Sequence, residues 1–167
     1  MTTRGGSAAA LAAALAQAGT EFLFGVPGGG ANLDVVEACE QAGLRFVLTH
    51  GETAGAIMAA VHGELTGRPG ACVATRGPGA AAMATGVAHG WLDRCPMLAV
   101  VDAVPAAQRE RISHQRLDQS RLLGAAAKAF VRLGDGSVAG RAVACASTPP
   151  WGPVVVETTP WRRVMRA

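Results

Sequence analysis

The amino-acid sequence predicts an α/β fold: a single doubly wound domain in which a six-stranded, mainly parallel sheet is flanked by helices on both faces. Short apolar runs alternate along the chain with segments of helical length, which is the order that crossover helices between parallel strands produce. The runs are continuously apolar, as strands covered by helices on both sides require. A length of 167 residues favours one domain, with an expected core at about 5–160 and a tail at 161–167.

The first expected helix, at 7–18, is rich in Ala and follows Arg4, which is also the order of residues in a signal peptide. It is better interpreted as a helix of the domain, because "EFLFGVPGG" follows it at once as a strand and a turn. The remaining elements alternate in the same way. We expect strands at 21–26, 44–49, 70–75, 96–101, 129–133 and 152–157, and further helices at 31–42, 52–65, 79–92 and 136–147.

The composition predicts closely packed backbones and argues against several kinds of partner. Hydrophobic residues make up 50% of the chain and aromatic residues only 4%, so Ala, Val, Leu and Gly must form the core. The formal charge is +3, but the arginines are scattered, so no nucleic-acid partner is expected. No apolar run is long enough to span a membrane. The four cysteines lack C-x-x-C spacing, which favours buried thiols in a reducing cytoplasm.

The loops that follow the expected strands are where a ligand site is expected, because doubly wound folds bind ligands at the carboxyl ends of their strands. These loops read "GVPGGGAN", "THGET", "TRGPGA" and "DAVPAAQRERISHQRLDQ". The first is rich in glycine but fails both nucleotide patterns: Leu33 replaces the third glycine of G-x-G-x-x-G, and Ala31 replaces the lysine of a P-loop. A tight turn is the simpler interpretation, and Pro27 between two glycines suggests that something rigid is packed against that turn.

Glu52 is the one carboxylate of the second loop, and its local pattern leaves two interpretations open. With Thr49 it forms the S/T-x-x-E pattern of a capping box, in which the two side chains satisfy backbone N–H groups at the start of a helix. Alternatively, the carboxylate does chemistry in surroundings that are otherwise small and apolar. His50 and His114 also lie in these loops, but no histidine has metal-ligand spacing with Cys or carboxylates, so no metal site is expected.

Several ordered motifs resemble one known family. They are "GVPGG", the Glu after the second strand, "TGRPGACVATRGPGA" through the third, "WLDRCPMLAV" into the fourth, and "HQRLDQ" followed by Lys128 before the fifth. Together they resemble the pyrimidine-binding (PYR) domain of thiamine diphosphate enzymes of the acetolactate synthase and 2-oxoacid decarboxylase type. The resemblance runs from about residue 5 to residue 160.

The resemblance implies a role for each matching residue. Glu52 stands where the family has its cofactor-activating glutamate, which shares a proton with the aminopyrimidine ring nitrogen. The resemblance makes the catalytic interpretation the preferred one. The turn that lines the cofactor pocket matches Val26, Pro27 and Gly28, and the turn that faces the pyrimidine matches Thr75, Gly77 and Gly79.

On the substrate side, the resemblance implies a role for Gln115, which matches a loop glutamine of acetolactate synthase-like members. Arg76 and His114 depart from the family pattern and become candidates for contact with an anionic or polar substrate. These departures leave the choice of substrate open.

The resemblance also implies a partner. A PYR domain forms one wall of the site, and a diphosphate-binding (PP) domain holds Mg²⁺ and the phosphates, so we expect the PYR subunit of a split enzyme acting on a 2-oxoacid, with a PYR–PYR homodimer contact. "GDGS" at 134–137 resembles the metal motif of PP domains, but its partner Asn is missing downstream, so a turn capped by Asp135 or Ser137 is expected. The alternatives are a non-catalytic PYR-like module and a flavodoxin-like nucleotide-binding protein.

Overall fold

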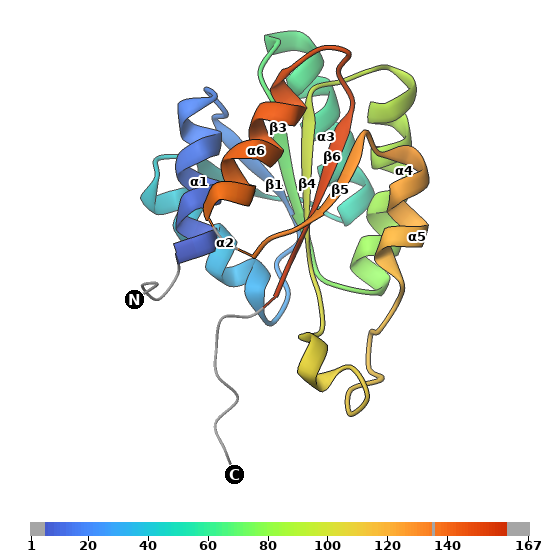
Figure 1. The fold of residues 1–167 in the computed structure, drawn as a ribbon. Helices are drawn as coiled ribbons and strands as arrows, with labels where there is room; N and C mark the ends of the chain where they lie inside the picture. Colours follow the sequence, from blue (N-terminus) through green and yellow to red (C-terminus); the bar gives the residue numbers. More distant parts are fainter. Residues whose placement is uncertain (1–5, 135, 160–167) are drawn as a thin grey trace.

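The computed structural model describes residues 6–134 and 136–159, and its centre is a parallel sheet. Six strands pair in the order β2-β1-β3-β4-β6-β5, and every neighbouring pair runs parallel (Figure 1). The doubly wound α/β fold is therefore confirmed, and each strand lies within one residue of its predicted range. The strands are β1 (Phe22–Gly25), β2 (Arg45–Leu48), β3 (Gly70–Ala74), β4 (Met97–Asp102), β5 (Ala129–Arg132) and β6 (Pro153–Thr158).

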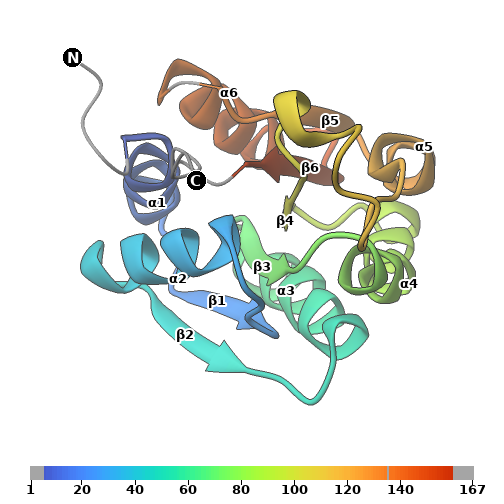
Figure 2. The same cartoon turned by 90° about the horizontal axis from the view of Figure 1, so that it is seen from below.

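Helices cover both faces of the sheet, as Figure 2 shows in the view from below. One face carries α1 (Gly6–Gln17), α2 (Ala31–Gln41) and α6 (Gly136–Ser147), and the other carries α3 (Glu52–Thr66), α4 (Pro78–Leu92) and α5 (Gln119–Leu123). Each group of helices buries its own cluster of small aliphatic side chains against the sheet. The strands β3, β4 and β6 are buried along their whole length, whereas the edge strands β2 and β5 are half-buried or exposed.

The long segment between β4 and β5 contains more structure than the sequence predicted. It leaves the sheet at its carboxyl edge, includes the 3₁₀ helix Ala106–Gln108, and returns through α5 and a second 3₁₀ turn, Gly124–Ala126 (Figure 1). The helix α5 is short, and its periodicity was too brief to identify from the sequence. It is fixed by the buried side chains Gln119 and Leu123.

The connections around β1 and β3 create the point at which a ligand crevice is expected. The chain passes from β1 through α2 to β2 on one side, and from β3 through α4 to β4 on the other, while β1 and β3 are neighbours. In open α/β sheets such a reversal opens a crevice at the carboxyl ends of the two strands. The turns after β1 and β3 are the glycine-containing loops singled out in the sequence.

The predicted close backbone packing is confirmed between α3, α4 and the sheet. A Cβ atom on Gly63 would lie 2.1 Å from the carbonyl oxygen of Pro96, and one on Gly86 would lie 2.4 Å from Cβ of Ala56. Of the four free thiols, those of Cys39, Cys72 and Cys95 are buried and that of Cys145 is half-buried. Burial raises the pKa of Cys39 to about 12. Within residues 6–134 and 136–159, the helices are all too short or too polar to cross a membrane.

Candidate functional site

Glu52 is the first residue of α3, and the helix begins differently from the capping-box prediction. Gly51 is the N-cap residue, in an extended conformation and with no side-chain cap. The hydroxyl of Thr49 donates instead to the carbonyl oxygen of Gly51 at 2.9 Å. The capping-box interpretation is wrong because Thr49 lies two residues before the N-cap, where its hydroxyl closes the turn after β2.

The carboxylate of Glu52 lies against the first turn of α4. A Cβ atom on Gly79 would lie 3.0 Å from Oε1 of Glu52 and 2.8 Å from Cγ2 of Thr75. Glu52 is half-buried, and within residues 6–134 and 136–159 its carboxylate has no hydrogen-bond donor. The side chain therefore brings a carboxylate to the carboxyl edge of the sheet, where no hydrogen bond from the described residues engages it.

The glycine-rich turn after β1 packs directly on the end of β3. A Cβ atom on Gly28 would lie 2.7 Å from Cβ of Thr75 and 3.1 Å from Nδ2 of Asn32. The sequence analysis expected a residue packed against the turn Val26-Pro27-Gly28. Thr75 is the residue that packs there. Because Gly28 and Gly79 have no side chains, the turns after β1 and β3 can both pack closely against Thr75.

Asn32 is a polar residue of this region that the sequence analysis did not identify. It lies in the first turn of α2 and is fully buried, and neither Nδ2 nor Oδ1 has a hydrogen-bond partner among the described residues. A buried amide of this kind is rare, because leaving it unsatisfied costs free energy. The available signal was that the only Asn of the chain directly follows the glycine-rich turn.

The turn after β3 is held by the long β4–β5 segment. Gly77 has φ +65°, and a Cβ atom there would lie 2.5 Å from the carbonyl oxygen of Gln115, so the position requires glycine. The N–H of Gly77 donates to Oε1 of Gln119 at 3.0 Å. Gln115 itself has φ +56° and is half-buried, whereas His114 is exposed. The structure therefore brings Gln115 to the β3 turn and leaves His114 outside.

Arg76 is engaged by a buried carboxylate. Its backbone N–H donates to Oδ1 of Asp102 at 2.6 Å, and its Nη1 donates to Oδ2 at 3.3 Å. Burial raises the pKa of Asp102, and the Arg76 contacts act in the opposite direction. Asp102 ends β4, so its position at the carboxyl edge could have been recognised from the sequence. Nε of Arg76 is buried without a partner in the described part of the chain.

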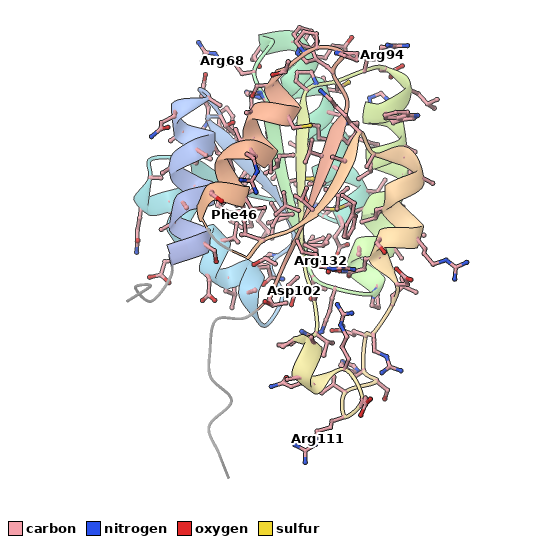
Figure 3. All side chains as sticks on the ribbon, in the orientation of Figure 1. Phe46, Arg68, Arg94, Asp102, Arg111 and Arg132 are labelled. Atoms are coloured by element: carbon pink, nitrogen blue, oxygen red, sulfur yellow. The ribbon has the colours of Figure 1, made fainter. Side chains whose placement is uncertain are left out.

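Beside this pair, the structure contains a cavity of about 300 Å³ at the carboxyl ends of β4, β5 and β6. Arg76 and Gln115, two of the predicted substrate-side residues, line it, whereas His114 and Glu52 do not. Its walls are formed by Arg76, Ala103, Val104, Arg109, Gln115, Arg116, Leu117, Asp118, Gln119, Ser120, Arg132 and Glu157. Figure 3 labels Asp102 and Arg132, which lie at the ends of β4 and β5 at this edge of the sheet.

The described residues include no group of three or more His, Cys, Asp or Glu side chains that could hold a metal ion. In the "GDGS" stretch, Asp135 lies outside the described residues. The helix α6 begins at Gly136, so Ser137 lies inside its first turn and is not the predicted cap.

The comparison with protein families identifies the chain. Residues 7–122 match the family described as "Thiamine pyrophosphate enzyme, N-terminal TPP binding domain". The chain belongs to this family. The match includes the turns after β1 and β3, Glu52 and Gln115, so the resemblance stated on the sequence motifs is confirmed.

Relatives of this thiamine pyrophosphate enzyme domain include acetolactate synthases. The chain is 34% identical over 122 residues to acetolactate synthase of Bacillus subtilis, covering 72% of this chain and 21% of that protein. It is 37% identical over 113 residues to acetolactate synthase of Arthrospira platensis, covering 65% and 19%. A probable acetolactate synthase large subunit of Methanocaldococcus jannaschii is 35% identical over 111 residues, covering 66% and 19%. The chain thus matches about a fifth of the length of these relatives.

Proposed function

We propose that this chain, as one PYR domain, is the pyrimidine-binding subunit of a split thiamine diphosphate enzyme that acts on a 2-oxoacid by decarboxylation or acyloin-type carboligation. The observation that carries the proposal is the carboxylate of Glu52, which lies at the carboxyl edge of the sheet without a hydrogen-bond donor in the described structure. Family membership supports the cofactor, and the acetolactate synthase relatives support the class of substrate.

The residues at the β1–β3 crevice fit the aminopyrimidine end of the cofactor. Gly28 and Gly79 let the two turns pack closely around Thr75 beside Glu52, and the buried amide of Asn32 has no hydrogen-bond partner among the described residues. Val26, Pro27, Thr75 and Gly77 form the adjoining turns. When bound, the cofactor would supply a carbon nucleophile for the 2-oxoacid carbonyl. Oε1 of Glu52 would exchange a proton with the pyrimidine ring nitrogen, which is the step that this chain contributes.

A second polypeptide would supply the groups that this chain does not provide. No metal-binding cluster is present in residues 6–134 and 136–159, and the chain corresponds to about a fifth of its relatives. We therefore assign Mg²⁺ and the diphosphate to a partner PP subunit. Large apolar side chains remain exposed on α3 and α4, including Met58, Trp91 and Leu92, and they support contact with the partner or with a second PYR domain. The free thiols are consistent with a cytoplasmic enzyme.

Reconstitution from separate polypeptides tests the split enzyme. The chain and a polypeptide carrying the PP domain, each purified alone, should show no 2-oxoacid turnover, and mixing them with Mg²⁺ and thiamine diphosphate should restore it. Pyruvate consumption and CO₂ release would be measured at increasing ratios of the two polypeptides, with activity saturating at a fixed ratio. A PP polypeptide that is fully active without this chain would instead support a non-catalytic PYR-like module.

Asn32→Leu tests whether the buried amide serves the cofactor. Leu has a similar volume and leaves no amide unsatisfied, so we expect the free energy of unfolding of the isolated chain to rise by about 1–3 kcal/mol. Cofactor affinity of the reconstituted enzyme should fall by about tenfold, the effect of losing one hydrogen bond of about 1.4 kcal/mol. Urea unfolding and cofactor titration would measure the two effects. Leu33→Ala on the exposed side of α2 is the control, and a less stable Asn32→Leu chain would contradict the assignment.

A further inference from the structure

The arginine-lined cavity contains more positive than negative side chains. Four arginines line it, and the carboxylates in its lining are those of Glu157 and Asp118. The buried Asp102 adds a third negative charge behind Arg76. The cavity lies at the carboxyl edge, where doubly wound folds bind ligands, and its volume of about 300 Å³ is that of a small-molecule site.

Glu157 is shared by two guanidinium groups. Its Oε2 lies 2.9 Å from Nε of Arg132 and 4.0 Å from Nη2 of Arg109, so the two arginines are close neighbours. Its other oxygen, Oε1, accepts a hydrogen bond from Nε2 of Gln119 at 3.0 Å. Both oxygens of this nearly buried carboxylate are therefore occupied, while it carries one negative charge against two positive ones.

The guanidinium donors of these arginines are only partly used. Arg132 donates through Nε, and its terminal nitrogens have no partner among the described residues. Arg109 makes one long hydrogen bond, from Nε to the carbonyl oxygen of Val104 at 3.5 Å, besides the 4.0 Å contact of its Nη2 with Glu157. Arg116 donates from Nη1 to the carbonyl oxygen of Arg109 and has no carboxylate partner in the described chain. Donors thus remain at the exposed side of the cavity.

The second carboxylate of the lining, Asp118, does not cancel this excess. Asp118 is the N-cap of α5, and its Oδ1 accepts from the Ser120 hydroxyl and from the Arg121 backbone N–H. These hydrogen bonds lower the pKa of Asp118, so it stays ionised, but they engage the same oxygen in the cap. Four arginines against three carboxylates leave the region positive.

We propose that this cavity binds a small oxyanion, as the second anionic group of a substrate that carries a carboxylate or phosphate-like group besides its 2-oxoacid function. Guanidinium groups recognise both kinds of oxyanion through paired N–H donors. The link to the substrate rests on the proposed function. Binding of the anion is independent of the proposed function, because the cavity is lined by none of the residues around Glu52. Gln115, which lines the cavity and packs on the β3 turn, lies between the two regions.

Calorimetric titration of the isolated chain with inorganic phosphate and, separately, with succinate tests the proposal, with sodium chloride at matched ionic strength as the reference. We expect saturable binding of at least one of the two, and the one that binds identifies a phosphate-like or a carboxylate ligand. Arg109→Gln should weaken that binding by about tenfold or more, because a hydrogen bond to a charged group is lost. Arg109 is suited to the test because its side chain is exposed and its contact with Glu157 is long, at 4.0 Å. Its replacement should therefore leave the fold intact.

Two further variants make the result decisive. Arg111→Gln changes an arginine at the tip of the same loop that does not line the cavity, and it should bind as the unchanged chain does (Figure 3). Glu52→Gln should also bind normally, which separates this inference from the proposed function. Absence of saturable binding by both anions would overturn the inference, as would equal binding by Arg109→Gln or loss of binding in Glu52→Gln.

Discussion

Glu52→Gln should lower kcat of the reconstituted enzyme by about 100-fold or more, the effect of removing a positioned acid–base group. The amide keeps the shape of the side chain and its position against Gly79, but it cannot exchange a proton with the pyrimidine ring nitrogen. Steady-state turnover of pyruvate would be measured at saturating cofactor, with cofactor affinity determined separately so that a binding defect is not mistaken for a slower reaction.

Glu64→Gln is the matched control for this change. Glu64 lies on the same helix α3 and is exposed. It is near the end of the helix, whereas Glu52 is its first residue, at the carboxyl edge of the sheet. We expect it to leave turnover unchanged. If Glu52→Gln retained the activity of the Glu64→Gln enzyme, the proton-exchange role would be refuted, although the fold and the family would stand.

Gly63→Ala should reduce the free energy of unfolding by about 3 kcal/mol or more, at the upper end of the cost of overpacking a core. The added Cβ would lie 2.1 Å from the carbonyl oxygen of Pro96. That oxygen accepts the N–H of Gly70 at 3.0 Å, so it is held at the start of the β3–β4 pairing. The contact cannot relax without a large cost in free energy, because both the helix α3 and the carbonyl group of Pro96 are backbone. Urea unfolding followed by circular dichroism gives the change directly.

Gly140→Ala is also a glycine-to-alanine substitution, but we expect it to raise the free energy of unfolding. Gly140 lies within α6, and no atom would come within 4 Å of its added Cβ. Alanine there should stabilise the chain by about 0.5–1 kcal/mol, because it reduces the freedom of the unfolded chain and favours the helix. A similar loss of stability in both variants would show that the contact between α3 and Pro96 is not the cause.

The central elements of the fold could be predicted because their sequence patterns agree with their surroundings. The apolar runs of β3, β4 and β6 are buried along their whole length, so composition alone identifies them. The helix α5 could not be found in this way, since five residues are too few for a period and its buried anchor, Gln119, is polar. The capping-box pattern failed because the hydroxyl of Thr49 bonds within the preceding turn.

The candidate site could be predicted only where a motif carried it. Glu52 and the glycine turns were found through resemblance to a family, and their catalytic and binding roles stay predictions. Asn32 was missed because a polar residue at the start of a predicted helix is usually solvated, and only the packing against Gly28 and Thr75 reveals its burial. The grouping of Arg109 with Arg132 depends on the return of a long loop, which local sequence does not encode.

Gln119 has a consequence for attempts to alter which substrates are accepted. Its amide joins the turn after β3 to the ends of β4 and β6. Oε1 accepts from the N–H of Gly77, and Nε2 donates to the carbonyl oxygen of Asp102 at 3.2 Å and to Oε1 of Glu157. One side chain thus braces both the arginine-lined cavity and the turn that leads to Gly79 beside Glu52. Redesign of specificity should therefore vary Arg109 or Arg116 and retain Gln119, because changing the brace would disturb both the proposed anion binding and the proposed proton transfer.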